Sequence, residues 1–130
     1  MLGNARLQTI VWTADVARAA AFYGEVLGLK RTGDSHGAAL FAVGEQELRV
    51  SPVPSTSPSP HTVLGFAVSS IDDVVASLAV RGVAFERFSN FRHDERGVWR
   101  APDGTELAWL RDPDGNLLSI VHYATTEESS

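Results

Sequence analysis

The stretch RDPDGNLLSIVHY, residues 111–123, places a tight turn directly before an apolar strand. Proline second and glycine fourth in DPDG are typical of a type I turn. The following residues, 117–123, are mostly apolar and predict a buried strand. Ser119, a small neutral residue, lies near the centre of that strand. Its meaning depends on the elements predicted around it.

The composition predicts one globular domain, residues 1–130, with small-molecule partners. The chain has 130 residues, of which 44% are hydrophobic and 21% charged. Its formal net charge of −5 argues against nucleic-acid and anionic membrane surfaces, because phosphate groups require a basic partner surface. We therefore expect a small molecule or a second copy of the chain as partner, with no nucleic acid and no membrane.

Cysteine and long apolar segments are missing from the sequence, and this excludes some chemistries and indicates a location. Cysteine does not occur, which excludes disulfides, thiolate metal sites and cysteine nucleophiles. The opening residues MLGNARLQ lack the apolar core of a signal peptide, and no stretch approaches the roughly 18 apolar residues of a membrane span. We expect a cytoplasmic protein.

The first half of the chain predicts a strand, a helix and three more strands. Residues 6–13 alternate as a strand does, and Asp15 is a good cap for an apolar-striped helix that ends at Gly28. The strand faces are Leu7, Thr9 and Val11, expected toward the helix, and Gln8, Ile10 and Trp12, expected inward. The later strands are expected at residues 30–35, 38–43 and 46–51.

The second half repeats this order after a Pro/Ser-rich connector, residues 52–60. Ser70 caps a predicted helix that ends at Gly82. Strands are expected at residues 62–68, 84–88, 98–101, 106–110 and 117–123. The repeat aligns Val11 with Phe66 at the same offset as Tyr23 with Leu78, so two βαβββ modules are predicted, about 6–52 and 62–123, with a frayed tail at 124–130.

The duplicated order and the motifs AAFYGEVLGLK (20–30) and LRDPDGNLLSI (110–120) resemble the vicinal oxygen chelate superfamily, the glyoxalase, bleomycin-resistance and extradiol dioxygenase group. The resemblance extends over residues 7–123. It implies an α+β fold in which each βαβββ module curls into half of an open, cavity-enclosing mixed sheet with its helix outside. Because this fold hosts lyases, dioxygenases, isomerases, transferases and drug-sequestering proteins, function must be argued from the site.

The resemblance also implies metal-ligand positions on inward-facing strands. The usual histidine of the first strand falls on Gln8. The usual glutamate of the last strand in the first module falls on Arg49, or on Glu47 or Ser51 after a slip of two residues.

In the second module the usual histidine falls on Val63 or Leu64, and the usual glutamate on Ser119. Divalent ions need several oxygen or imidazole donors with negative charge, and an arginine repels a cation. We therefore expect no metal ion. The four histidines lack metal-site spacing and are expected on the surface or in turns: His36, His61, His93 and His122.

The remaining inward positions predict an apolar pocket for a planar ligand. Trp99 and Trp109 either contact a ligand or pack in the core or against a second copy. Arg49 either pairs with an anionic group of the ligand or lies on the surface beside Glu45 or Glu47. The candidate ligand-binding residues are Gln8, Ile10, Trp12, Arg49, Val63, Gly65, Ala67, Trp99, Trp109, Ser119 and Val121.

Three functions follow from these candidates. The first is metal-independent binding, in which a homodimer of the bleomycin-resistance type sequesters a planar or aromatic ligand without a cofactor. The alternative is a lyase, isomerase or dioxygenase that holds a divalent metal ion through Gln8, Glu47 and a histidine such as His61. The third is a metal-free catalyst that orients its substrate through Gln8, Ser119 and Tyr123.

Overall fold

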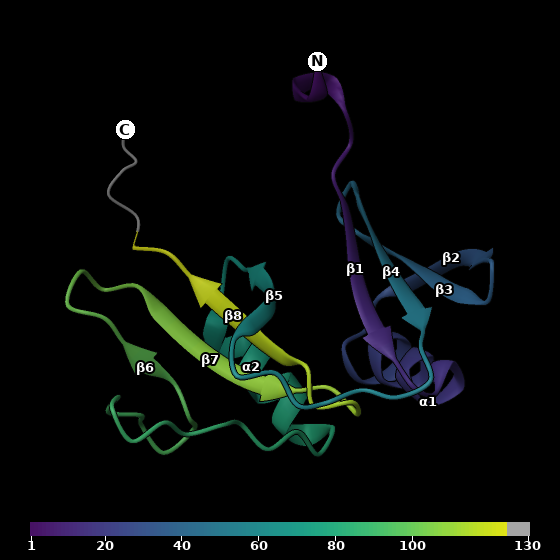
Figure 1. Ribbon diagram of the computed structural model, residues 1–130. Coiled ribbons are helices and arrows are strands. Elements are labelled where there is room, and N and C mark those ends of the chain that lie inside the picture. The colour runs from purple at the N-terminus through teal and green to yellow at the C-terminus, as the bar shows by residue number, and fades with distance from the viewer. Residues whose placement is uncertain (125–130) are drawn as a thin grey trace. The chain divides into compact units, whose positions relative to one another are not determined.

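The computed structural model describes residues 1–124 and divides into two compact units, each with its own four-stranded sheet (Figure 1). The first unit comprises Met1–Pro58 and Asp112–Asn116. The second comprises Ser59–Arg111 and the described chain from Leu117 onward. The predicted tail lies outside the described residues, except for Ala124. Within residues 1–124, no helix has the length and apolar character needed to cross a membrane.

The first unit follows the predicted strand, helix and three-strand order. Its sheet has the order β1-β4-β3-β2, with β1 parallel to β4 and the other pairs antiparallel. The Asp15 side chain caps α1 by accepting a hydrogen bond from the Arg18 N–H at 3.1 Å. The elements are η1 (Leu2–Asn4), β1 (Gln8–Thr13), α1 (Val16–Ala21), the π-helical η2 (Phe22–Val26), β2 (Lys30–Ser35), β3 (Ala38–Val43) and β4 (Gln46–Pro52).

Strand alternation separates the two faces of this sheet as the sequence predicts. Val11 and Thr13 are buried, whereas Gln8, Ile10 and Trp12 are exposed on the opposite face of β1. The buried face continues across β4 and β3 and packs against α1. One expectation fails: Leu7 precedes β1 and is exposed instead of packing on the helix. The core of this unit includes Val11, Ala19, Tyr23, Ala39, Phe41, Leu48 and Val50.

The second unit has the same βαβββ order, so the predicted duplication is confirmed. Its sheet has the order β5-β8-β7-β6, and β5 is parallel to β8. The Ser70 side chain caps α2 by accepting from the Asp73 N–H. The elements are β5 (Thr62–Ala67), α2 (Ile71–Val80), β6 (Trp99–Arg100), β7 (Glu106–Arg111) and β8 (Leu117–His122).

The strand predicted at residues 84–88 is wrong. This segment has no regular secondary structure, although the Glu86 N–H donates to the Trp109 carbonyl at 2.8 Å. The segment AFERF contains three apolar residues, but a single backbone hydrogen bond to β7 does not form a ladder. The segment instead begins the long connection from α2 to β6.

A buried hydrogen bond fastens the Asp112–Asn116 turn into the first unit. The Tyr23 hydroxyl donates to Asp112 Oδ2 at 2.7 Å, and both residues are almost fully buried. Burial, the charge of Asp112 and this hydrogen bond all raise the pKa of Tyr23, so its hydroxyl keeps its proton. The two sequence motifs that carry the family resemblance therefore meet at one bond.

The same turn makes further hydrogen bonds to the first unit. Asn116 donates from Nδ2 to Asp112 Oδ2 at 2.7 Å and to the Trp12 carbonyl at 3.1 Å. Asp114 accepts from the Ala14 N–H and the Thr56 hydroxyl, each at 2.9 Å. These bonds fix the end of β1, where Trp12 lies.

We predict that Tyr23→Phe destabilises the protein by about 1–3 kcal/mol, because the buried Asp112 carboxylate loses a donor that water does not replace. Urea unfolding measures the change. Tyr123→Phe is the matched control, since Tyr123 is 65% exposed, and it should leave the midpoint unchanged. Equal midpoints for Tyr23→Phe and wild type would show that the bond does not stabilise the fold.

Candidate functional site

The exposed face of the first sheet combines polar and apolar side chains. Gln8 lies opposite Glu47 in the parallel β1–β4 pair, and its Nε2 donates to Glu47 Oε2 at 2.8 Å. Glu47 also lies 4.0 Å from the Arg6 guanidinium. The Gln8 amide and the Glu47 carboxylate are therefore hydrogen-bonded to each other at one end of this face.

Arg49 is a half-buried cation in the middle of the same face, in register with Ile10 on β1 and Leu40 on β3. Its Nε donates to Ser51 Oγ at 3.1 Å, and its Nη2 donates to the Ser35 carbonyl at 2.9 Å. Both acceptors are neutral, and no carboxylate within residues 1–124 forms an ion pair with this guanidinium. The hydrogen bonds orient the cation but leave its charge unbalanced.

Trp12 gives this face its largest apolar surface. Its side chain is 52% exposed, and Ile10, on the same face of β1, is 43% exposed. Trp12 also forms one wall of a hollow of about 280 Å³ in the first unit, which the connector and the turn complete. The other lining residues are Val53, Ser55, Thr56, Ser57 and Asn116. An indole with hydroxyl and amide groups nearby suits a planar ligand with polar edges.

The second sheet carries its candidate residues on one face as well. Val63, Gly65 and Ala67 are exposed on β5, whereas Leu64 and Phe66 are partly buried on the opposite face. Ser119 and Val121 are buried on β8, in register with Gly65 and Ala67. Ser119 Oγ lies so close to Gly65 that a Cβ added there would be 3.0 Å from it.

Aromatic side chains from the connection between α2 and β6 cover part of this second face. The Phe91 ring stacks on Trp109 with centroids 5.4 Å apart and an interplanar angle of 8°. It also lies 4.4 Å from the Trp99 ring, and Phe88 packs edge-on against Trp109 at 5.3 Å. Trp99 and Trp109 therefore make core contacts within this unit, and Phe91 is the aromatic partner that the sequence analysis missed.

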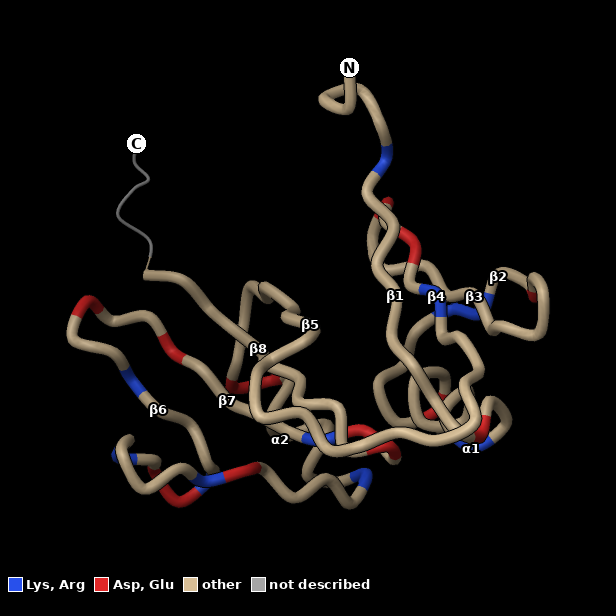
Figure 2. Tube along the Cα trace, viewed as in Figure 1, with Lys and Arg blue, Asp and Glu red and all other residues tan. Residues whose placement is uncertain are grey.

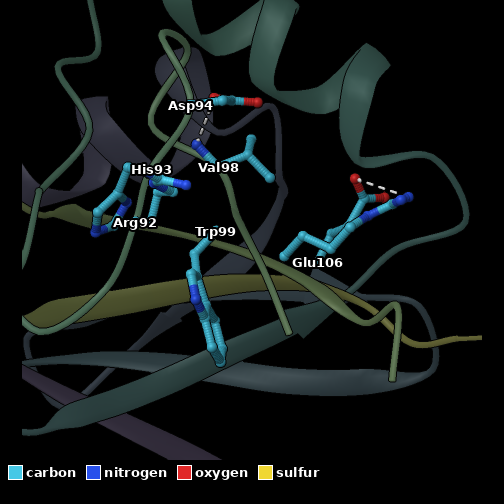
Figure 3. Close-up of a pocket in the computed structure, with 7 residues that line it drawn as sticks. Arg92, His93, Asp94, Val98, Trp99 and Glu106 are labelled. Atoms are coloured by element: carbon cyan, nitrogen blue, oxygen red, sulfur yellow. Dashed lines mark hydrogen bonds and ion pairs between the residues drawn. The ribbon is translucent and has the colours of Figure 1, made fainter. Parts of the chain in front are cut away.

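A hollow of about 470 Å³ lies beside the aromatic cluster (Figure 3). Figure 3 shows Arg92 and His93 together on one side and Glu106 on the other. Glu106 pairs with Arg100 at 3.6 Å, and Arg92 makes no ion pair within residues 1–124. The lining residues are Arg92, His93, Asp94, Val98, Trp99, Arg100 and Glu106. Of these the sequence analysis selected only Trp99 as a site residue; the polar stretch NFRHDERG was the available signal for Arg92, His93 and Asp94.

Asp94 organises the loop at the edge of this hollow. It accepts hydrogen bonds from the Val98 N–H at 2.9 Å and from the Arg96 side chain at 2.8 Å. Desolvation raises the pKa of Asp94, but the hydrogen bonds from Arg96 and from the Val98 and Arg96 N–H groups lower it below its ordinary value. Arg96 also bonds to Asp72 on α2, so this loop is tied to the helix.

The donor set does not fit the metal site that the family resemblance implies. Within residues 1–124, no three histidine, aspartate or glutamate side chains come together in a group that could hold an ion. Gln8 is bonded to Glu47, Arg49 supplies a positive charge, and Ser119 supplies one neutral hydroxyl. Charge is also mixed over the described chain, where acidic and basic residues are interspersed (Figure 2).

Comparisons with known proteins agree with this fold. The model of the Glyoxalase/Bleomycin resistance protein/Dioxygenase superfamily matches residues 6–120. No curated protein matches the sequence.

Solved structures of similar proteins support the fold alone, because their sequence identities are low. A superfamily member from Sphaerobacter thermophilus has a TM-score of 0.74 and 19% identity, covering 95% of this chain and 100% of that one. A glyoxalase/bleomycin resistance protein/dioxygenase from Alicyclobacillus acidocaldarius has a TM-score of 0.72 and 20% identity, with 98% and 97% covered. Lactoylglutathione lyase from Agrobacterium tumefaciens has a TM-score of 0.71 and 20% identity, with 92% and 93% covered.

The contact between Gly65 and Ser119 generates a stability prediction. Gly65→Ala should destabilise the protein by about 1 kcal/mol, because the new Cβ would press on Ser119 Oγ. In a Ser119→Ala background the cost should disappear, giving a coupling that a urea double-mutant cycle measures. Gly33→Ala is the control, since that strand glycine has open space around it. Zero coupling would contradict the contact.

Proposed function

The chain belongs to the Glyoxalase/Bleomycin resistance protein/Dioxygenase superfamily, and from the side chains at its candidate site we propose that it binds a planar organic anion without a metal ion. One observation carries this proposal: the Arg49 guanidinium, oriented by Ser35 and Ser51, has no carboxylate partner within the described residues. A half-buried cation is costly without a counter-charge, and an anionic ligand supplies one.

The surroundings of Arg49 favour a planar organic ligand over a small inorganic anion. Ile10 lies opposite Arg49 on the neighbouring strand. Trp12 lies two residues beyond Ile10 on β1, roughly 7 Å from it. That distance suits one or two fused rings, which would lie on the apolar side chains while an acidic group reached Arg49. The hollow beside Trp12 offers hydroxyl and amide groups to a further polar edge.

The positive charge of Arg49 also favours direct binding of an anion over metal-assisted chemistry. A carboxylate at this place would help to hold a divalent ion, whereas a guanidinium binds the oxygens of an acid directly. The protein then recognises an anionic oxygen pair through N–H donors where a metal enzyme would use Lewis-acid coordination. One structural neighbour is named a lactoylglutathione lyase, and this name supports an enzyme as the alternative function.

We predict that replacing Arg49 weakens the binding of an organic acid but changes the binding of the corresponding neutral amide little. For the wild type, 2-naphthoate should bind more tightly than neutral 2-naphthamide at neutral pH. Arg49→Gln should weaken 2-naphthoate about 10- to 100-fold, the range for one lost charge-assisted hydrogen bond, and change 2-naphthamide little. Isothermal titration calorimetry measures both affinities.

Arg31→Gln is the matched control for this titration. It removes the same charge from β2 of the same sheet, where Arg31 pairs with Asp34 at 2.6 Å. Arg49→Lys keeps the charge but loses the fixed fork and should recover only part of the affinity. If Arg49→Gln and Arg31→Gln have equal effects, Arg49 is not the anion anchor.

We predict that the metal-stripped protein does not bind nickel, manganese, zinc or ferrous ion stoichiometrically at micromolar affinity. The physical reason is the donor set, which offers an amide already bonded to Glu47, a cation and a hydroxyl. Calorimetric titration, with elemental analysis of the protein as purified, measures this. Tight binding of one ion would instead favour the lyase, isomerase or dioxygenase alternative.

A further inference from the structure

The turn between β2 and β3 lies beside Arg49 and contains a histidine in an uncommon backbone conformation. Ser35 pairs with Ala38, so the two strands are joined by the two-residue turn His36-Gly37. Both turn residues have positive φ angles, 51° for His36 and 83° for Gly37, as a type I′ hairpin turn requires. Within residues 1–124, His36 is the only residue other than glycine with a positive φ. Asparagine and glycine are preferred at this position, so the turn itself does not select a histidine.

The strand register places this turn on the same face of the sheet as Arg49. Leu40 on β3 lies opposite Arg49, and Ala38 lies two residues before Leu40, so both β3 side chains share the face of Arg49. Ser35 pairs with Ala38 and therefore shares that face as well. The Ser35 side chain thus lies on the face where we propose that a ligand binds.

Ser35 contacts the side chains of both Arg49 and His36. Its carbonyl accepts from Arg49 Nη2 at 2.9 Å, and its hydroxyl oxygen lies 3.0 Å from His36 Nδ1. The guanidinium also donates from Nε to Ser51, so it extends from β4 toward the hairpin turn. One serine therefore holds a guanidinium and an imidazole near each other at the end of the exposed face.

Both side chains keep N–H donors that no group within residues 1–124 accepts from. Arg49 donates from Nε and from one N–H of Nη2, which leaves the other N–H groups of its fork for a ligand. When the Ser35 hydroxyl donates to His36 Nδ1, the imidazole proton is on Nε2, which has no partner in this part of the chain. Because His36 is exposed, this N–H is accessible to a molecule that arrives from solvent.

We propose that His36 is a second anchor of the Arg49 site, and that the ligand is a planar aromatic acid with a second acidic group on the adjacent ring carbon. One carboxylate accepts from the remaining N–H groups of Arg49, and the other accepts from His36 Nε2. The rings extend from these anchors toward Ile10 and Trp12 on the same face. This inference rests on the proposed function, because it names the class of acid that the same site selects.

Adjacent acidic groups suit this arrangement because both anchors are bonded to one residue. Carboxylates on neighbouring ring carbons lie close together, as do side chains that contact the carbonyl and the hydroxyl of a single serine. A hydrogen bond is stronger when its acceptor is charged, so even a neutral imidazole favours a carboxylate. No carboxylate within residues 1–124 forms an ion pair with Arg49 or His36 and competes with the ligand.

Isothermal titration calorimetry with three acids tests the second anchor. At about pH 8, where an exposed imidazole is mostly neutral, the wild type should bind 2,3-naphthalenedicarboxylate about tenfold more tightly than 2-naphthoate, for one added charge-assisted hydrogen bond. The 2,6-isomer carries the same charge but has its acidic groups at opposite ends of the rings. It reaches only one anchor and should bind about as tightly as 2-naphthoate.

Replacing His36 separates its side chain from its place in the turn. His36→Asn removes the imidazole and supplies a residue that the turn prefers, and His36→Gly does the same without a side chain. Both variants should lose the gain of the 2,3-diacid over 2-naphthoate, bind 2-naphthoate as the wild type does, and keep a urea midpoint at or above that of the wild type. His61→Asn is the control, since His61 is an exposed histidine of the other unit, and it should keep the gain.

Arg49→Gln distinguishes failure of this inference from failure of the proposed function, because it should weaken both 2-naphthoate and the 2,3-diacid. The inference alone is overturned if Arg49→Gln has this effect but the 2,3-diacid binds no more tightly than its 2,6-isomer, or if both His36 variants keep the gain. Loss of the gain together with a lower urea midpoint in both variants would show a structural role for His36 and would also overturn it. If Arg49→Gln changes the binding of neither acid, the proposed function fails, and this inference fails with it.

Discussion

The buried bond from the Tyr23 hydroxyl to the Asp112 carboxylate is the contact on which the geometry of the first unit depends. Asp112 is almost fully buried, and its two oxygens accept from Tyr23, Asn116 and two backbone N–H groups of its own turn. A buried carboxylate is tolerated only when it is satisfied in this way. The turn then positions Asn116 against the Trp12 carbonyl. A bond between core residues thus sets the place of a candidate ligand-binding side chain.

The sequence predicted those features that depend on local periodicity. Alternation on β1 separated Ile10 and Trp12 from Val11, and the capping residues Asp15 and Ser70 marked both helix starts. The strand prediction failed at residues 84–88, because a short run that contains apolar residues describes a partly buried segment whether or not a neighbouring strand is available to pair with it. Backbone pairing is a tertiary property, and within residues 1–124 this segment makes one backbone hydrogen bond to β7, from the Glu86 N–H to the Trp109 carbonyl.

The sequence predicted where the candidate site residues lie on their strands, but it did not predict which groups surround their side chains. The strand period put Arg49 on the same face as Ile10, yet its neutral partners come from β4 itself and from the end of β2, and no spacing rule reveals them. Trp99 and Trp109 were recognised as candidates, but Phe91 and His93 belong to an irregular connection whose path only the structure gives. Phe91 packs against both tryptophans, and a ligand contact of Trp99 and Trp109 stays a prediction.

Corresponding positions of the two sheets carry side chains of different chemistry. Arg49 pairs with Ile10 across the parallel strands of the first sheet, and Ser119 pairs with Gly65 across those of the second. A metal site would need donors of like chemistry at these places, whereas here one is a cation and the other a buried hydroxyl. The first sheet leaves its apolar side chains exposed around a fixed charge, so it suits an acid that arrives from solvent. In the second sheet, Phe91 of the same unit lies against Trp109, so this indole is buried whereas Trp12 of the first sheet is exposed.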